Sequence, residues 1–207
     1  RAALADIRVG EDPTAPTIDS DWGEPGLSPA ERVFAWNTLE VLAFKTGDPD
    51  GPLNAVPPHA KATLQLRFVV GTDWQNLIRN VRAHLDAHGF PMIEVRPARA
   101  AEVFQATRLP VEDPWVEWAL ESIEASSGKK PALLPNLGGS LPNDAFSEIL
   151  GLPTLWVPHS YPACRQHGPD EHMLASGTRE GLAIMAGLFW DLGEAGPDIL
   201  RRRKARA

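Results

Sequence analysis

The chain has 207 residues, of which 43% are hydrophobic, and a formal net charge of -7. This length can bury a core for one large domain or two small ones. The negative charge argues against a general nucleic-acid binder, which needs clustered Lys and Arg to neutralise phosphates. A basic cluster occurs only at residues 201–206 (RRRKAR) and is interpreted as a solvated tail after the last helix. We expect neither a nucleic acid nor a membrane as a partner.

The single cysteine, Cys164, excludes an internal disulfide and favours a reducing, cytoplasmic setting. A thiol enzyme built on Cys164 is one alternative, although a lone thiol near a proline-rich turn is more often incidental. No apolar stretch has membrane-spanning length, and no signal-peptide core occurs at the start. Because the first residues, RAALADIRVG, lack an initiator Met, we expect the chain to begin within a longer protein.

The first half begins with residues 10–30, which are dense in Pro, Gly and Asp and predict an extended connector. Residues 37–47 (NTLEVLAFKTG) follow as a strand, and GDPDGP forms a turn. Residues 60–71 (AKATLQLRFVVG) alternate with period two, which is typical of a half-buried strand in an antiparallel sheet. One face carries Ala62, Leu64, Leu66, Phe68 and Val70, and the other carries Thr63, Gln65 and Arg67.

A helix is predicted next, with Thr72 or Asp73 as its cap and Gly89 at its end. Its apolar stripe consists of Trp74, Leu77, Ile78, Val81 and Leu85. Residues 91–97 (PMIEVRP) then predict a short strand. The order strand, strand, helix, strand indicates an α+β sandwich with helices on one face of a sheet. A ferredoxin-like unit would require one more strand-helix pair before it, and that pair is missing.

The second half alternates short apolar runs with helices. A helix starts at Asp113-Pro114 and stops at Gly128. Its expected buried face carries Trp115, Trp118, Ala119 and Ile123. PALLP (131–135) and PTLWVP (153–158) predict buried strands, and helices follow at 145–150 and 177–192. This pattern indicates α/β, so the overall class is α/β with a boundary near Leu109, giving domains 1–108 and 109–207.

Functional groups of an α/β sheet collect on loops after its strands, and two loops here qualify. Gly138, Gly139 and Ser140 precede a helix, where backbone N–H groups and a hydroxyl suit an anion such as a carboxylate. A tight strand-to-helix turn explains the same residues equally well. No lysine follows them as in a phosphate loop.

The other loop, CRQHGPDEHM (164–173), contains His167 beside a Gly-Pro turn. Histidine is a common metal ligand, but a loop histidine is more often a surface or packing residue. His172 and His159 are weaker candidates, because no second ligand lies at a recognisable spacing. A zinc ion needs three or four protein ligands, and the chain has no HExxH motif and no paired cysteines.

Two residues of the first half are further candidates. Arg67 projects from the polar face of its strand and could hold a carboxylate through two parallel hydrogen bonds, or could simply be solvated. Asn54, in the turn NAVPP before the same strand, could donate to a carbonyl oxygen, although Asn in a turn needs no function.

The ordered set NAVPP, LQLRFVVG, LPNLGGSLPNDAF and QHGPDEHM resembles the di-zinc metallopeptidase and deacylase superfamily. That superfamily includes carboxypeptidase G, carnosinase-like dipeptidases, acetylornithine deacetylase and succinyl-diaminopimelate desuccinylase. The similarity runs from about residue 37 to residue 194. It implies that residues 1–108 form most of a lid domain that makes a homodimer, and that residues 109–207 close the catalytic domain.

The resemblance also implies roles for single residues. His167 matches the last zinc ligand, in a loop where Gln166 and Asp170 stand for two asparagines of the family's usual pattern. Gly139 and Ser140 match the loop that holds the substrate's carboxylate, and the lid residue Arg67 reaches the same group. Asn54 matches a lid residue that polarises the scissile carbonyl, in the partner subunit's site.

The implied activity is zinc-dependent hydrolysis of an amide bond in a dipeptide or N-acyl amino acid, with two zinc ions per full-length subunit. The resemblance matches no part of this sequence to the family's metal-binding histidine-x-aspartate motif, bridging aspartate or glutamate pair, so the chain alone is expected to be inactive. A non-catalytic homodimerisation or ligand-binding module remains the alternative.

Overall fold

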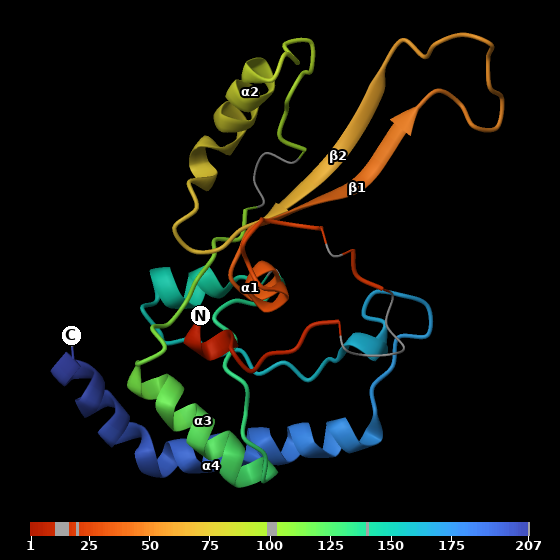
Figure 1. The fold of residues 1–207 in the computed structure, drawn as a ribbon. Helices are drawn as coiled ribbons and strands as arrows, with labels where there is room; N and C mark the ends of the chain where they lie inside the picture. Colours follow the sequence, from red (N-terminus) through yellow and green to blue (C-terminus); the bar gives the residue numbers. More distant parts are fainter. Residues whose placement is uncertain (11–16, 20, 99–102, 140, 207) are drawn as a thin grey trace.

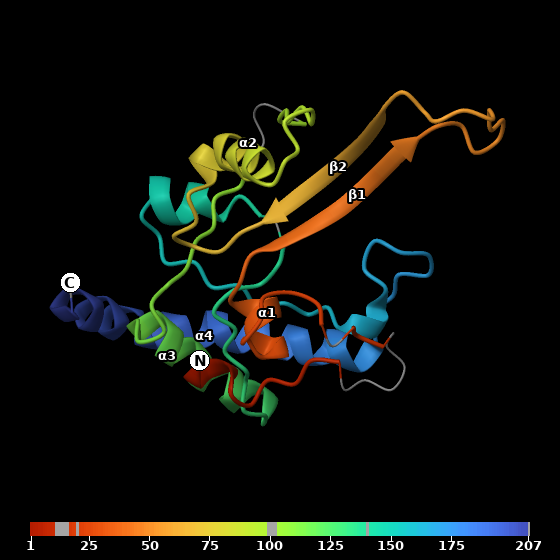
Figure 2. The same cartoon turned by 45° about the horizontal axis from the view of Figure 1, so that its top comes forward.

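The fold is known from a computed structural model, which describes residues 1–10, 17–19, 21–98, 103–139 and 141–206. A long β-hairpin and helix α2 project from one end of the molecule, and helices α3 and α4 form the opposite end (Figure 1). The same arrangement is visible after rotation (Figure 2). Part of the predicted connector at 10–30 lies outside the described residues. The mixed helix-and-strand class predicted from the sequence is confirmed.

The hairpin consists of β1 (Thr38–Thr46) and β2 (Ala60–Arg67), which pair antiparallel as predicted. Leu39 lies opposite Leu66, Val41 opposite Leu64, and Phe44 opposite Ala62. The register shifts between Val41 and Ala43, so Leu42 is the extra residue of a bulge. This shift keeps Phe44 on the same face as Leu39 and Val41, because directly paired residues share a face. The hairpin therefore has one continuous apolar face, and that face is exposed.

Helix α2 (Leu77–Ala87) follows one turn of 3-10 helix, η2 (Trp74–Asn76). Gly89 has a φ of 82°, the left-handed conformation that ends a helix as predicted. The predicted strand at 91–97 is wrong: this segment has no strand pairing. A strand exists only where a neighbour supplies hydrogen-bond partners, and no described residues lie beside it in a ladder.

Two short helical elements lie near the start of the chain. They are η1 (Ala2–Leu4) and helix α1 (Pro29–Phe34). Ser28 and Glu31 form a capping box, in which each side chain accepts from the other's backbone N–H. This arrangement holds the pKa of Glu31 below its ordinary value, chiefly through the hydrogen bond from the Ser28 backbone. The spacing S-P-x-E was thus a helix signal within the expected connector.

Helix α3 (Pro114–Ser127) begins and ends as predicted. The Asp113 side chain accepts from the Trp115 N–H at 2.9 Å, and Gly128 is left-handed. Its predicted buried face is only partly right, since Val116, Ala119 and Ser122 are buried while both tryptophans are half-buried. The helix is rotated because small residues, rather than indoles, meet the neighbouring helix.

That neighbour is helix α4 (Ala175–Arg206), which was predicted only over 177–192. The helices approach so closely that a Cβ on Gly187 would lie 1.9 Å from Ser126 Oγ. Nearby, Ser122 Oγ donates to Asp191 Oδ2 at 2.6 Å. Packing against α3 explains why α4 continues through Pro197, which removes one helical hydrogen bond.

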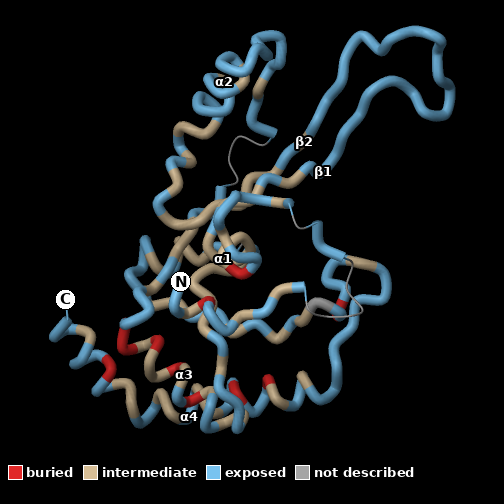
Figure 3. The backbone as a smooth tube through the Cα atoms, in the orientation of Figure 1, coloured by how far each residue is buried: buried red, intermediate tan, exposed pale blue. Residues whose placement is uncertain are grey.

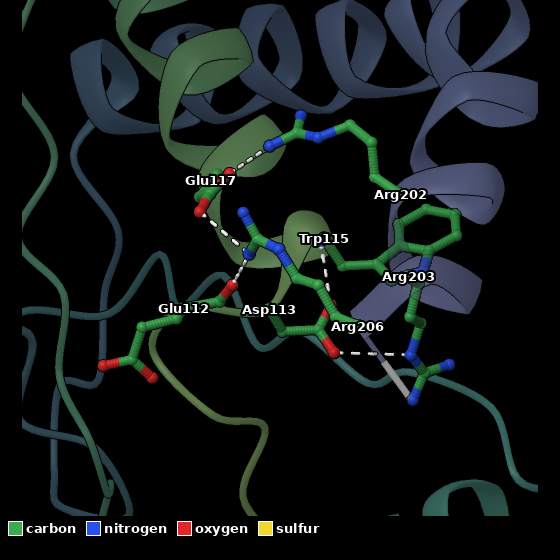
Figure 4. A network of polar contacts seen from close by, with 7 residues as sticks. All are labelled: Glu112, Asp113, Trp115, Glu117, Arg202, Arg203 and Arg206. Carbon is green, nitrogen blue, oxygen red and sulfur yellow. Dashed lines mark hydrogen bonds and ion pairs between the residues drawn. The ribbon is translucent and has the colours of Figure 1, made fainter.

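The interpretation of residues 201–206 as a tail after the last helix is wrong, because they form the last turns of α4 and bind the start of α3 (Figure 4), although most of them are exposed as expected. Arg202 and Arg206 both donate to the Glu117 carboxylate, and Arg206 also donates to the Glu112 carbonyl. Arg203 Nε lies 3.3 Å from Asp113 Oδ2. These contacts tie residues 112–117 to the end of the chain and hold the pKa of Glu117 below its ordinary value, chiefly through the Arg206 hydrogen bond.

The strands predicted at 131–135 and 153–158 are also wrong. Both segments are irregular, and the described residues contain one sheet, with two strands. The apolar runs have the composition of buried strands, but the described chain offers them no strand to pair with. The helix predicted at 145–150 is one turn of π-helix, η3 (Ala145–Ile149), and a 3-10 turn, η4 (Pro162–Cys164), precedes the His167 loop.

Buried residues concentrate around α3 and α4, with a few near α1 and the start of the chain (Figure 3). The hairpin and α2 have none among their described residues. Across the described ranges, no helix combines the length and apolarity needed to cross a membrane.

Candidate functional site

The base of the hairpin brings Arg67 against the glycine loop of the second half. Arg67 is the last residue of β2, and its Nη1 donates to the Gly138 carbonyl oxygen. Its Nε lies 3.1 Å from Glu40 Oε1, across the hairpin on β1. Two candidates that are 71 residues apart in the sequence are therefore neighbours in space. Ser140, the third candidate of this group, lies outside the described residues.

Asn37 fixes the hairpin base from which Arg67 projects. Its Oδ1 accepts from the Val69 N–H at 2.9 Å and from Thr72 Oγ1 at 3.1 Å. One side chain at the start of β1 thus ties down the segment that leaves β2. Because this satisfies a backbone donor in a half-buried place, it limits movement of the strand end.

A cavity of about 340 Å³ opens beside Arg67. Most of its lining comes from the hairpin base, the segment before α3, and the loops 132–139 and 154–158. Its apolar lining includes Trp36, Phe68, Phe104, Leu137 and Trp156. An apolar cavity with a few polar groups at one wall is the usual form of a small-molecule site.

Gly139 is required by the shape of this wall. A Cβ at this position would lie 2.4 Å from the Trp156 ring, so only glycine lets the loop pass the indole. The Gly139 N–H donates to the Leu137 carbonyl at 2.8 Å. This N–H is therefore engaged within the loop, and the tight-turn explanation of Gly139 accounts for the geometry seen.

Asn54 lies in the exposed connection between β1 and β2, at the opposite end of the hairpin from Arg67. Eight strand residues separate the two ends, which corresponds to roughly 26 Å of strand at about 3.3 Å per residue. The structure therefore does not bring Asn54 to the Arg67 cavity of the same chain.

His167 lies on an exposed loop and does not line the cavity. Its φ is 63°, and its backbone N–H donates to Glu171 Oε2 at 3.1 Å. Arg165 and Asp170, in the same loop, also have positive φ. Among the described residues, no other non-glycine residues adopt this conformation, so the strain is confined to the segment predicted to hold a metal.

The other titratable candidates of this region have structural surroundings. His172 Nδ1 lies 2.8 Å from the Asp170 carbonyl, and the His159 ring packs against Gly181 of α4. Cys164 is buried, and its carbonyl accepts from the His172 N–H. Burial removes Cys164 from contact with a substrate, which counts against the thiol-enzyme alternative.

Within the described ranges, no three His, Cys, Asp or Glu side chains are grouped so that they could hold a metal ion. His167 has Glu171 nearby, but a zinc site needs three or four protein ligands. The donors present thus do not complete a metal site by themselves.

Sequence reasoning missed Asn37, Trp156 and Arg108 as residues of the site. Trp156 lay in a run interpreted as a buried strand, and its contact with Gly139 has no local signal. Arg108 was treated as part of a domain boundary, whereas it lines the cavity. Polar residues at a predicted boundary were the one signal that could have found it, since sites often lie between domains.

Comparisons with known proteins agree with this arrangement. The model of the peptidase dimerisation domain family matches residues 4–92. A crystal structure of an M20 family metallo-carboxypeptidase, Sso-CP2 from Sulfolobus solfataricus, superposes with a TM-score of 0.60 and 21% identity. The match covers 81% of this chain and 39% of that chain, so this chain spans well under two thirds of the carboxypeptidase. No curated protein matches the chain.

The likeness to the carboxypeptidase is one of fold, and the matched domain accounts for the hairpin and α2. The partial ferredoxin-like lid expected from the sequence is thereby confirmed. Residues 4–92 thus match the model of a peptidase dimerisation domain, and the chain shares its fold with a metallo-carboxypeptidase of the M20 family.

Proposed function

We propose that the chain supplies the lid and the closing part of the catalytic domain, divided near residue 109, of a zinc-dependent amide hydrolase. Its substrate is a dipeptide or an N-acyl amino acid. The observation that carries this proposal is the hydrogen bond from Arg67 to the Gly138 carbonyl. It joins the lid to the glycine loop at the wall of a cavity, and these are the two parts predicted to share a substrate carboxylate.

Arg67 and Ser140 bind that carboxylate in this proposal, and Gly139 contributes by letting its loop pass the Trp156 ring. A guanidinium presents five N–H donors, so Arg67 can keep its bond to Gly138 and still offer a pair of donors to a ligand. The apolar lining, including Trp156 and Phe68, would accept the substrate's side chain. The half-buried position of Arg67 strengthens its attraction for an anion relative to a fully solvated arginine.

Asn54 acts in the site of a second subunit, and the protein is a homodimer through the lid. Two observations support this. Asn54 lies a hairpin's length from the cavity of its own chain, and the apolar hairpin face is exposed. Leu39, Val41 and Phe44 are 66%, 64% and 66% exposed, more than a lone water-soluble hairpin favours. In the partner's site the Asn54 amide would donate to the oxyanion.

His167 is the metal ligand of this chain in the proposal. Its exposed, strained loop supports the assignment, and in this proposal the remaining ligands and the carboxylate base come from parts of the full-length enzyme other than this chain. When bound, zinc polarises the scissile carbonyl and lowers the pKa of a water. The lone cysteine fits a reducing compartment such as the cytoplasm.

The carboxylate role is tested with Arg67→Ala in the protein as its source produces it. We expect the KM for an N-acyl amino acid to rise at least about tenfold, because a hydrogen bond to a charged group is lost. The matching carboxamide, which lacks the charge, should respond much less. Arg79→Ala on the exposed face of α2 is the control, since Arg79 lies outside the cavity. An unchanged KM would make Arg67 a merely solvated residue of the sheet face.

The metal role is tested with His167→Ala, measured by metal content and by turnover. Loss of both supports the assignment, since removing a ligand weakens the site. Arg79→Ala, on exposed α2, is the control here as well. Full metal content with retained turnover would remove His167 from the site.

A non-catalytic homodimerisation module is the second candidate, and the exposed hairpin face favours it. Two measurements on the intact protein distinguish the two functions: its oligomeric state by sedimentation, and its hydrolysis of a panel of acyl amino acids. A dimer that Phe44→Lys dissociates, with no hydrolysis of any compound in the panel, would favour the module.

A further inference from the structure

Helix α2 carries a pair of histidines that the proposed function does not use. His84 lies in the last turn of the helix and His88 is its C-terminal cap. Residues four positions apart lie on the same side of a helix, so their side chains are neighbours. The centres of the two rings are 4.1 Å apart, with 31° between the ring planes. Both residues are exposed, and neither lines the cavity beside Arg67. Two imidazoles are therefore held side by side on the surface of α2, which projects away from α3 and α4 (Figure 1).

The hydrogen bond of His88 determines which of its ring nitrogens is free. Its Nδ1 lies 2.8 Å from the His84 carbonyl oxygen. A carbonyl oxygen only accepts, so in the neutral ring Nδ1 carries the proton and Nε2 keeps its lone pair. A histidine that binds a metal commonly donates its other ring N–H to a carbonyl in this way, which fixes the direction of the ring. The His84 ring makes no hydrogen bond to any described residue, so one nitrogen of each ring is available to a shared ion.

The end of α2 holds this pair in place and favours a positive ion there. The Arg82 side chain donates to the carbonyls of Phe90 and Ile93, which ties the segment after the helix back onto it. Asp86 forms an ion pair with Arg82 at 2.8 Å and so offsets the charge of that arginine. The C-terminal end of a helix carries the negative end of its dipole, which attracts a cation. The histidine pair thus lies where a bound cation is stabilised and where the backbone is anchored.

We propose that His84 and His88 together bind a divalent transition-metal ion, with copper(II) preferred. Imidazole nitrogens suit copper, nickel and zinc rather than magnesium or calcium, and among these ions the affinity is highest for copper. Two neighbouring nitrogens on one metal lie about 3 Å apart, since each bond is about 2 Å long. Rings whose centres are 4.1 Å apart can supply them. No third His, Cys, Asp or Glu joins the pair in the described ranges. Water therefore fills the remaining positions, which the tetragonal geometry of copper(II) with nitrogen and oxygen ligands accepts.

The test is a calorimetric titration of the intact protein with copper(II), with the metal that the protein already holds left in place. His84→Ala and His88→Ala should each weaken copper binding at least about tenfold, because even the outer partners of a metal ligand typically contribute that much. His59→Ala is the control, since His59 is exposed in the connection between β1 and β2 and has no second histidine beside it among the described residues. Electron paramagnetic resonance should show two imidazole nitrogens on the copper in the unmodified protein and one in either variant of the pair. Circular dichroism without added copper checks that α2 stays folded in both variants.

Three results would overturn the assignment: no copper binding by the unmodified protein, copper held through one imidazole only, or equal losses in His59→Ala and in the variants of the pair. Magnesium binding at the pair with the same affinity as copper would also contradict it, because the site would then not select for imidazole-binding ions. None of these measurements uses a substrate. The histidine pair is therefore tested independently of the proposed hydrolase, and either proposal can fail without the other.

Discussion

The two halves of the chain are stabilised in different ways. No described residue from 35 to 112 is buried, although the hairpin and α2 have clear apolar faces. In the second half, small residues let α3 and α4 approach closely, and Val116, Ala119, Ile184 and Ile199 form a core. The lid half is held by backbone pairing and by Asn37, and the second half by side-chain burial.

This difference shows that an apolar pattern in the sequence predicts a face that must be buried, but does not identify the element or chain that buries it. Leu64 and Phe44 lie on one face of the hairpin and are 49% and 66% exposed. A dimerisation domain has a ready explanation for such a face, since a second copy can bury it. The following variants would break or sharpen the contrast between the halves.

The largest effect is expected for Ile199→Ala. Ile199 is 2% exposed, so its truncation removes buried area and leaves a cavity, and the free energy of unfolding should fall by about 2 to 5 kcal/mol. Phe44→Ala is the matched change in the lid and should cost less than about 0.5 kcal/mol in dilute protein. Urea unfolding monitored by circular dichroism measures both.

The stability cost of each of these two variants should also be measured at several protein concentrations. If the cost of Phe44→Ala rises with protein concentration, a second copy covers the hairpin face, because association then contributes to stability. Equal costs for the two variants at every concentration would contradict the division of the chain into a buried half and an open half.

A smaller effect is expected where α3 and α4 approach each other. In Gly187→Ala the new Cβ would lie 1.9 Å from Ser126 Oγ and 3.1 Å from Ser126 Cβ, so the helices must separate. We expect a loss of about 1 to 3 kcal/mol from overpacking. Gly193→Ala on the same helix meets nothing within 4 Å and should be neutral or gain up to about 1 kcal/mol. Thermal midpoints that fall equally would show that glycine flexibility, and not close approach, matters at Gly187.

Local signals predicted the elements that depend on local chemistry. Asp113 and Gly128 correctly bounded α3, and period two correctly gave β2. The predictions of strands at 91–97, 131–135 and 153–158 were wrong, because a strand forms only beside a second strand, and composition does not reveal whether one is there. The end of α4 was predicted wrongly for the same kind of reason. Residues 201–206 are helical because Glu117 and Asp113 bind them, and these contacts come from a distant part of the sequence.

The site divides in the same way. Resemblance to a family selected Arg67 and the glycine loop, and the fold brought Arg67 and Gly138 together. Arg108 could not be found by such reasoning, because its place at the cavity depends on how distant parts of the chain fold together. The roles of Asn54, Ser140 and His167 stay predictions until the variants above are measured.

The smallest effect is expected where Arg202 and Arg206 bind Glu117 (Figure 4). The Arg206 hydrogen bond holds the pKa of Glu117 below its ordinary value of 4.5. The ionised carboxylate therefore stabilises the fold above the unfolded-state pKa, and this contribution is lost as the pH falls through the lower, folded-state pKa. Glu117→Gln should unfold at a lower temperature than the unmodified protein near neutral pH, and the difference should shrink below about pH 4.5. The control is Glu121→Gln, one turn further along the exposed side of α3. If the unfolding temperatures of the two variants depend on pH in the same way, the contacts of residues 201–206 with α3 do not depend on the Glu117 charge. Packing around Ile199 alone then holds the end of α4 in place.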